Sequence, residues 1–414
     1  MRISTQSMYQ TATNQLGDLQ TALARTQQQL STNRKNLTPS DDPIATARAL
    51  QVTQSQAINT QLGTNRQGAE SSLTSEEQAL ASTAALIQNV QTLAVSAGNG
   101  SLNDSDRAGL ATQLQGQLAD LMGLANTTDA TGNYVFSGYQ SSTPPFAQAA
   151  GGVSYLGDQG QRQLQVSTGR QIAISDPGSA VFQNIATGNG SFVTAADPGN
   201  AARGGSGVVS GGSVTDASKL TGDKYTITFS GASPSTSYTV TDNTTGQPVP
   251  VPVPPALVVP TAYVSGQQIA FDGMQFNVQG IPAAGDQFTL APSSKQSLFT
   301  TLSNLINVLN TPATGAAGQA ALTNGLSDAQ LNLGSALGNV LTVQTSVGTR
   351  LNQLDTLDTA GNDLNLQYTT TLSGLQDLDT VAAISMFTQQ QTTLDAAQKS
   401  FKAISSLSLF NYIN

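Results

Sequence analysis

The chain has 414 residues, of which 38% are hydrophobic and only 10% are charged, and it contains no cysteine, histidine or tryptophan. This composition excludes disulfides, thiolate nucleophiles, imidazole bases and the commonest zinc ligands, so the sequence predicts no enzyme, no metal site and no cofactor. A net charge of -9 with no basic run argues against nucleic acid or anionic lipid as a partner.

The N-terminus, "MRISTQSMYQ", lacks the apolar stretch of a secretory signal, and no later run approaches the ~18 apolar residues of a membrane span. We therefore expect no membrane insertion and, if the protein is exported, no cleaved signal peptide.

From residue 1 to about 126 the chain predicts long helices, because apolar residues return at intervals of three and four. The first stripe comprises Tyr9, Ala12, Leu16, Leu19, Leu23, Thr26, Leu30 and Leu37. A second stripe steps by seven through Leu73, Leu80, Ile87 and Ala94.

Two adjacent carboxylates, Asp41 and Asp42, stand before Pro43 and a run of helix-forming residues. Proline at the first helical position costs no hydrogen bond, and aspartate before it is a good N-cap, worth about 1 kcal/mol. The alternative is an acid/base pair or a calcium site. Neighbours in sequence point apart, and no EF-hand spacing follows, so the pattern favours a turn that starts a helix.

The middle of the chain, from about residue 132 to 292, predicts a β-rich region. Glycine and proline separate short alternating runs such as "KYTITFSG", "TSYTVTDNTTG", "QQIAFDGMQFNVQG" and "GDQFTLAP". The segment "PVPVPVPP" is excluded as a central strand, because proline donates no ladder hydrogen bond, so we expect an edge strand or a linker there.

Helical patterning returns from residue 297 to 414. Leu333, Val340, Val347 and Leu354 lie in one seven-residue register, which we expect to continue through Tyr368, Leu375, Ala382, Ala396 and Ala403. Near the C-terminus, Phe387, Leu394 and Phe401 also recur by seven. The two ends of the chain are therefore expected to pair as neighbouring coiled-coil-like helices.

The predicted fold class is multidomain α + β: long helices from both termini pack together, with a β-rich sandwich or hairpin domain inserted between them. The expected domains are 1–42 with 370–414, loose in the monomer; 43–131 with 296–369, a helical bundle; and 132–295, β-rich, with a hairpin region at 132–184 and a variable insertion at 185–295. The apolar stripes on the terminal helices are expected both for a core within one subunit and for contacts between subunits. The stripes are narrow, so a core within one subunit would bury too little apolar area to offset the ordering entropy, and contacts between subunits are favoured. The candidate contact residues are Leu16, Leu19, Leu23, Leu30, Ile384, Phe387, Leu394, Phe401, Ile404 and Leu407.

Several segments resemble the bacterial flagellin family, and within it the hook-associated protein 3 group. They include the opening residues, "TPSDDPIATARAL", "GNYVFSGYQSSTPPF", "VSYLGDQGQRQLQV" and the ending "QQQTTLDAAQKSFKAISSLSLFNYI". The hairpin region distinguishes the group, through Tyr134, Phe136, Gly138, Tyr139 and Phe146. Two residues depart from the family pattern: Asn33 replaces a usual glycine, and Ala383 a frequent acidic residue.

This resemblance implies an extracellular, structural role in the flagellum, after export by the flagellar type III apparatus. The implied partners are further copies of the chain in a ring, hook-associated protein 1, flagellin and an export chaperone. The implied function is the junction layer between hook and filament. Two alternatives remain open: a minor filament flagellin, or an exposed β-domain with an added adhesive or glycan-binding role.

Overall fold

The computed structural model describes residues 5–253, 256–258 and 260–406. The chain forms two compact units. Unit 1 contains residues 1–64 and 356–414, and unit 2 contains residues 65–355. This division runs through two long helices, α2 (Pro43–Ala97) and α6 (Gly315–Gln376). The three domains expected from the sequence have other boundaries, and that division stays a prediction.

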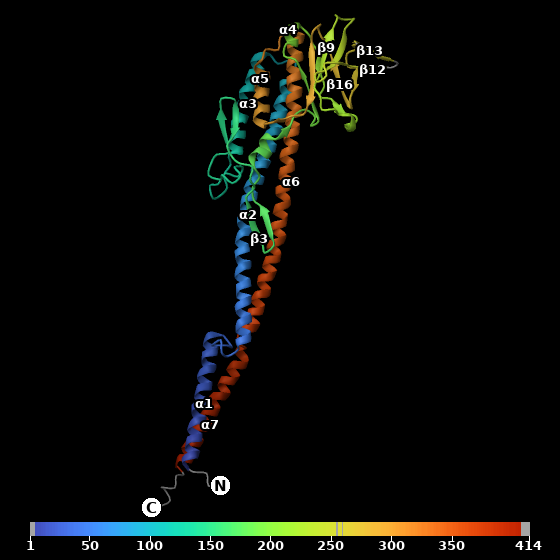
Figure 1. Cartoon of the computed structure of the whole chain (residues 1–414). Coiled ribbons are helices and arrows are strands. Elements are labelled where there is room, and N and C mark those ends of the chain that lie inside the picture. Colours follow the sequence, from blue (N-terminus) through green and yellow to red (C-terminus); the bar gives the residue numbers. More distant parts are fainter. Residues whose placement is uncertain (1–4, 254–255, 259, 407–414) are drawn as a thin grey trace, which may run out of the picture. The chain divides into compact units, whose positions relative to one another are not determined.

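Unit 1 is built from helices alone in its described residues. Helices α1 (Thr5–Thr32) and α7 (Thr380–Ser406) lie side by side (Figure 1), and the start of α2 and the end of α6 complete the unit. Many exposed threonine hydroxyls donate to the carbonyl four residues earlier, as Thr11 does to Ser7 and Thr21 to Gly17, both at 2.8 Å. These bonds let an uncharged polar surface cover a helix.

The helical part of unit 2 has a continuous apolar core. The α2 stripe predicted at Leu73, Leu80, Ile87 and Ala94 is buried, as are Leu333, Val340, Val347 and Leu354 on α6. Two shorter helices, α3 (Asp104–Ala125) and α5 (Leu298–Asn310), pack against each other. Asn103 and Asp106 form a reciprocal capping box that starts α3, and Ser297 caps α5.

Two hairpins follow α3. The first joins β1 (Phe146–Ala149) to β2 (Gly152–Tyr155), and the second joins β3 (Gln163–Ser167) to β4 (Arg170–Ala173). A single π-helical turn covers Ser179–Gln183. The short strands β5 (Ile185–Ala186) and β18 (Lys295–Gln296) then pair with each other. This pairing brings together the two ends of the β-rich segment that lies between them in sequence.

The inserted β-rich part contains two antiparallel sheets. One has the order β11-β10-β9-β17-β6, with β14 also paired to β10, and the other has the order β15-β16-β7, with β8 also paired to β16. The strands of the first sheet are β6 (Phe192–Ala196), β9 (Tyr225–Ser230), β10 (Ser237–Asp242), β11 (Pro248–Val249), β14 (Thr261–Ala262) and β17 (Gln287–Pro292). Those of the second are β7 (Val208–Val209), β8 (Ser213–Val214), β15 (Gln268–Phe271) and β16 (Met274–Gln279). A separate pair joins β12 (Val251–Val253) and β13 (Ala256–Val258).

Inward-facing residues of both sheets share one core. It includes Phe229 and Phe288 from the first sheet and Phe276 and Val278 from the second. The alternation read from the sequence holds: burial in β9 and β16 switches with each residue. The proline-rich segment supplies β11, which is an edge strand of the first sheet. An edge strand tolerates proline, because on its outer side no neighbouring strand needs a hydrogen bond from the proline nitrogen.

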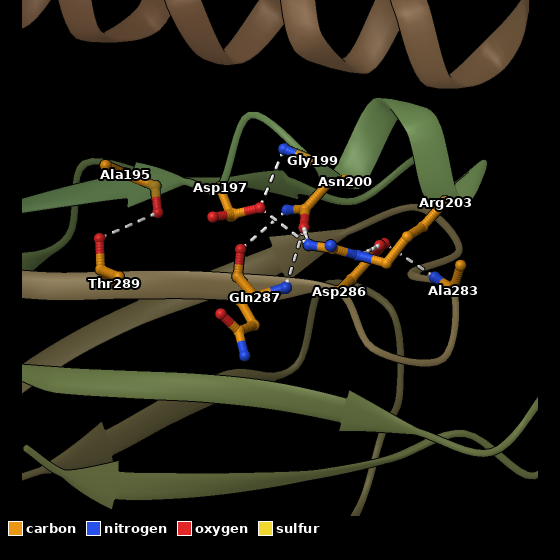
Figure 2. A network of polar contacts seen from close by, with 9 residues as sticks. All are labelled: Ala195, Asp197, Gly199, Asn200, Arg203, Ala283, Asp286, Gln287 and Thr289. Carbon is orange, nitrogen blue, oxygen red and sulfur yellow. Dashed lines mark hydrogen bonds and ion pairs between the residues drawn. The ribbon is translucent and has the colours of Figure 1, made fainter.

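Figure 2 shows a polar network beside the short helix α4 (Asn200–Arg203), where β6 ends and β17 begins. Arg203 donates to Asp197 at 2.8 Å and to Asn200 at 2.9 Å, and its Nε lies 3.4 Å from the fully buried Asp286. The Asn200 side chain exchanges two hydrogen bonds with the Gln287 backbone, at 2.8 and 2.9 Å. The network satisfies a buried carboxylate and is structural in character.

The predicted fold class is confirmed: long helices from both ends of the chain enclose, in sequence, a β-rich domain. Among the described residues, every helix is too polar or too short to cross a lipid bilayer.

Candidate functional site

The turn between α1 and α2 is fixed by the two aspartates singled out in the sequence. The Oδ1 atom of Asp42 accepts the Ala45 N–H at 2.9 Å, which is N-cap geometry for α2. Asp41 does something else: its Oδ2 accepts the N–H groups of Leu37 and Thr38 at 2.8 and 3.0 Å, and it pairs with Arg25 at 2.7 Å. The Thr38 N–H holds the pKa of Asp41 below its usual value.

Asn33 explains how the chain leaves α1. Its φ angle is +54°, in the left-handed region that glycine prefers and that asparagine tolerates better than most residues. Its carbonyl accepts the Leu378 N–H at 3.2 Å, and the Lys35 N–H donates to the Gln376 carbonyl at 3.0 Å. The replacement of the usual glycine therefore keeps the turn, and the turn is tied to the junction of α6 and α7.

The α1/α7 pair carries a groove of about 490 Å³. Its apolar lining comes from Ala12, Leu16 and Leu19 on α1 and from Ala397 and Phe401 on α7. Tyr9 meets Phe401 edge to face at 5.9 Å, and Thr26 donates to Gln390 at 2.9 Å. The two helices pack along each other and leave an apolar groove between them.

The predicted contact residues have different environments in unit 1. Leu394 is buried, while Leu16, Leu19, Leu23, Leu30, Phe387 and Phe401 are half-buried and so serve the helix pair in part. Ile384 is 55% exposed. Ile404 belongs to α7, but its side chain, like the whole of Leu407, lies outside the described residues. Their role in contacts between subunits stays a prediction.

Other exposed apolar residues of unit 1 were missed in the sequence. They are Met8, Ile44, Leu50, Ile58, Leu366, Val381 and Met386, all more than 40% exposed. Most lie off the heptad stripes, and this is the signal that could have found them: an apolar residue on a helix whose buried face is already assigned. Together they give unit 1 more apolar surface than its internal packing covers.

The hairpin region divides into core and surface. Phe136 and Phe146 are buried against Phe182, with ring centroids 5.2 and 5.4 Å apart, while Tyr134 is half-buried and Tyr139 is 66% exposed. Residues 132–145 form turns, and only Phe146 enters a strand, so the hairpin itself lies at 146–155. The quoted motif is therefore the approach to the hairpin, and it supplies aromatic anchors.

Gly138 is required by a close approach. Its φ angle is +72°, and a Cβ there would lie 2.1 Å from the Asp158 carboxylate. That carboxylate accepts the Tyr139 N–H at 3.0 Å, and the Tyr155 hydroxyl donates to the Asp158 carbonyl at 2.7 Å. Burial raises the pKa of Tyr155 to about 12, so the phenol remains a donor. These contacts fix Tyr139 at the surface.

A buried charge cluster joins α2, α6 and the segment before the π-helical turn. Arg350 pairs with Asp176 and donates to the Ala173 carbonyl at 3.1 Å, and Gln161 donates to Asp176 at 2.6 Å. Glu76 is fully buried and accepts the Asp176 N–H at 3.0 Å. Burial, and then the nearby Asp176, raise the pKa of Glu76 well above its ordinary value.

This cluster contains no nucleophile, and the described residues hold no group of three or more side chains suited to a metal ion. What the geometry offers is a fixed scaffold in unit 2 and underfilled apolar surface in unit 1. Exposed apolar surface of this kind is typical of interaction sites.

Comparison with known proteins gives the same picture. Residues 3–141 match the family model of the bacterial flagellin N-terminal helical region, and residues 199–292 match that of a flagellar hook-associated protein 1 D2-like domain. The chain is 30% identical over 411 residues to flagellar hook-associated protein 3 of Escherichia coli K12, which covers 99% of each chain.

Solved structures agree. The crystal structure of the flagellar junction protein FlgL from Legionella pneumophila is 34% identical, with a TM-score of 0.71, covering 80% of this chain and 100% of that one. That of Xanthomonas campestris FlgL is 30% identical, with a TM-score of 0.69, covering 78% and 99%. On the strength of this full-length likeness, the chain belongs to the flagellar hook-associated protein 3 family.

Proposed function

We propose that this chain is a structural subunit of the bacterial flagellum and forms the junction layer between the hook, through hook-associated protein 1, and the flagellin filament. The observation that carries the proposal is the likeness over 99% of the chain to a flagellar hook-associated protein 3. A solved relative named as a flagellar junction protein supports the same role. The proposal is structural rather than enzymatic.

The surface of unit 1 supports assembly into a ring. The α1/α7 groove and exposed residues such as Val381 and Ile384 are apolar on a pair of helices that buries little within itself. Asymmetric subunits that cover such faces on their neighbours make head-to-tail contacts, which close into rings or continue as helices. We propose that the predicted stripes are buried in this way against further copies, hook-associated protein 1 and flagellin.

The route of export and the location follow from the same proposal. The protein leaves the cell through the flagellar type III apparatus, with a chaperone holding the C-terminal helix, and resides on the extracellular flagellum. A chain without cysteine fits this route, since no disulfide has to be broken or formed during passage. The match of residues 199–292 to a hook-associated protein 1 domain supports a shared architecture on neighbouring parts of the flagellum.

Electron microscopy of cells that lack this gene tests the proposal, together with an assay of flagellin in the culture medium. Bare hooks with unpolymerised flagellin shed into the medium are expected, and the wild-type gene restores filaments. Normal filaments in the deletion strain would contradict the proposal and leave the two alternatives, a minor filament subunit or an added surface activity.

A matched pair of variants tests the surface. Ile384→Glu places a charge on an exposed apolar position of α7, and Gln389→Glu places the same charge on an exposed polar position of the same helix. We expect Ile384→Glu to be secreted normally but to restore at most a tenth of the wild-type number of filaments, while Gln389→Glu restores them fully. Equal filament counts for the two variants would remove Ile384 from the contact surface.

A further inference from the structure

A cavity of about 280 Å³ lies in unit 2, where the segments flanking β5 and β18 meet α5 and α6. Thr187 and Ser294 line it from the flanking segments, and Leu305 and Val308 from α5. Ser294 and Asn304 are exposed lining residues and mark its mouth. The volume far exceeds the ~10–15 Å³ that one water molecule needs, so the cavity has room for a side chain or a small ligand.

Asp328 on α6 is the ionisable residue in this lining. It is half-buried, and within the described residues it receives no hydrogen bond and no ion pair. Asp286 is a useful contrast, because that buried carboxylate accepts the Ala283 N–H at 2.8 Å and faces Arg203 at 3.4 Å. A half-buried carboxylate without a donor loses part of its hydration, and a cation that enters the cavity offsets that loss.

The rest of the lining suits a cation with an alkyl stem. Gln296 donates its amide N–H to Thr301 at 2.9 Å, which leaves the Gln296 side-chain carbonyl available as an acceptor. Leu305 and Val308 form an apolar wall of the cavity. Val308 packs tightly against α6, because a Cβ added at Gly325 would lie only 2.6 Å from the Val308 side chain. One anionic end and one apolar side match an ammonium or guanidinium group on a short hydrocarbon chain.

We propose that this cavity, which we call the Asp328 cavity, binds a compact organic cation whose ammonium or guanidinium group pairs with Asp328 and whose alkyl stem lies along Leu305 and Val308. The source is a lysine side chain of another copy of this chain or a free aliphatic amine. The inference rests on unit 2 alone and does not depend on the flagellar role.

The charge state of the cavity sets the pH dependence of binding. Burial raises the pKa of Asp328 to about 7. The other lining side chains are neutral, and Lys295, next to two of them in sequence, is exposed and makes no ion pair with Asp328. A cation takes the ionised carboxylate, so affinity rises as the pH increases from 6 to 8, by about tenfold for a group that titrates midway between.

Titration of the full chain with butylammonium, followed by NMR, tests the proposal, with 1-butanol as the uncharged probe. We expect saturable binding at pH 8, about tenfold weaker binding at pH 6, and at least tenfold weaker binding in Asp328→Asn. Asp363→Asn removes an exposed carboxylate from the same helix and should bind as the wild type does. Butanol that binds as well as butylammonium, or binding that ignores pH and the Asp328→Asn change, would overturn the proposal.

A second experiment distinguishes the two sources of the cation. It uses wild-type chains, so its outcome does not depend on whether Asp328→Asn folds. Carbodiimide is added to a mixture of isotopically light and heavy chains, and Asp328 cross-links are identified by mass spectrometry. A link between light and heavy peptides supports a side chain of another copy as the source, and butylammonium binding without such a link supports a free amine. Linkage of Asp328 to Lys295 of its own chain in the wild type, with no butylammonium binding, would overturn the proposal.

Discussion

Units 1 and 2 are made from the same kinds of helices, yet they hold together very differently. Of the buried apolar side chains in the described residues, unit 1 contributes Ala45, Ala49, Ala383 and Leu394, and unit 2 contributes all the others, including every buried phenylalanine. Small buried residues stabilise little, because the hydrophobic effect scales with the apolar area removed from water. The difference teaches that unit 2 has an apolar core of its own, whereas unit 1 buries few large apolar side chains within itself.

Hydrogen exchange on the isolated monomer should separate the two units most strongly. We expect amides of α2 within unit 2 to exchange at least about 1,000-fold more slowly than those of α1 and α7, which corresponds to about 4 kcal/mol of opening free energy. Brief proteolysis should likewise remove both ends first, to about residue 40 at the N-terminus, and leave unit 2. Equal protection of α1 and of the unit 2 part of α2 at low protein concentration would break the comparison.

Removing one arginine from each unit sharpens the contrast. Arg350→Leu leaves Asp176 and Glu76 as neighbouring buried acids without their cation, so we expect unit 2 to lose about 3–5 kcal/mol of unfolding free energy. Arg25→Leu breaks a pair whose arginine is 55% exposed, so the loss should stay below about 1 kcal/mol. Denaturant unfolding of both variants measures the difference, and similar losses would mean that burial does not distinguish the two pairs.

The stability of unit 2 should depend on pH through Glu76. The pKa of this carboxyl is raised in the folded state, so its favourable contribution is present below its ordinary value of 4.5 and is lost as the pH rises through the folded value. The unfolding free energy should therefore decline as the pH rises above about 4.5, and Glu76→Gln should flatten the decline. Urea unfolding between pH 4 and 8 tests this, and an identical slope in the two proteins would reject it.

The most local effect is expected at the α2 cap in unit 1. Asp42→Ala removes the acceptor for the Ala45 N–H and should cost about 1 kcal/mol locally. Exchange rates of the first α2 amides should rise roughly fivefold, with no change in the midpoint of unit 2 unfolding. Asp42→Asn keeps an acceptor and is the control, and a global loss of stability in Asp42→Ala would show that the two units are not independent.

The sequence revealed the elements whose pattern is local. Heptads placed the α2 and α6 core residues of unit 2 correctly, and alternation found β9, β10, β15, β16 and β17. The seven-residue register from Leu333 to Ala403, which Gly361 and Gln389 weaken, does not follow a single helix, because α6 ends at Gln376 and Asp379 caps a new helix by accepting the Val381 and Ala382 N–H groups. Ala382, Ala396 and Ala403 are exposed as a result.

Contacts between distant residues could not be read in this way. Glu76 and Asp176 are 100 positions apart, and Arg350 lies a further 174 away, so no spacing rule connects them. The position of Tyr139 at the surface depends on Asp158, whose carboxylate accepts the Tyr139 backbone N–H and leaves no room for a Cβ at Gly138. The aspartate cap before Pro43 was readable because the cap lies within four consecutive residues, from Asp42 to Ala45.

The pairing of β5 with β18 has a consequence for engineering. Ala186 lies opposite Lys295 in this two-stranded ladder, and facing residues in such a ladder are only about 5 Å apart. The chain therefore leaves for the β-rich part and returns at nearly the same point, so a short turn joining these two residues can replace that whole part without stretching the helices. The same junction is a natural graft site, at which an unrelated domain with adjacent termini can be carried as cargo.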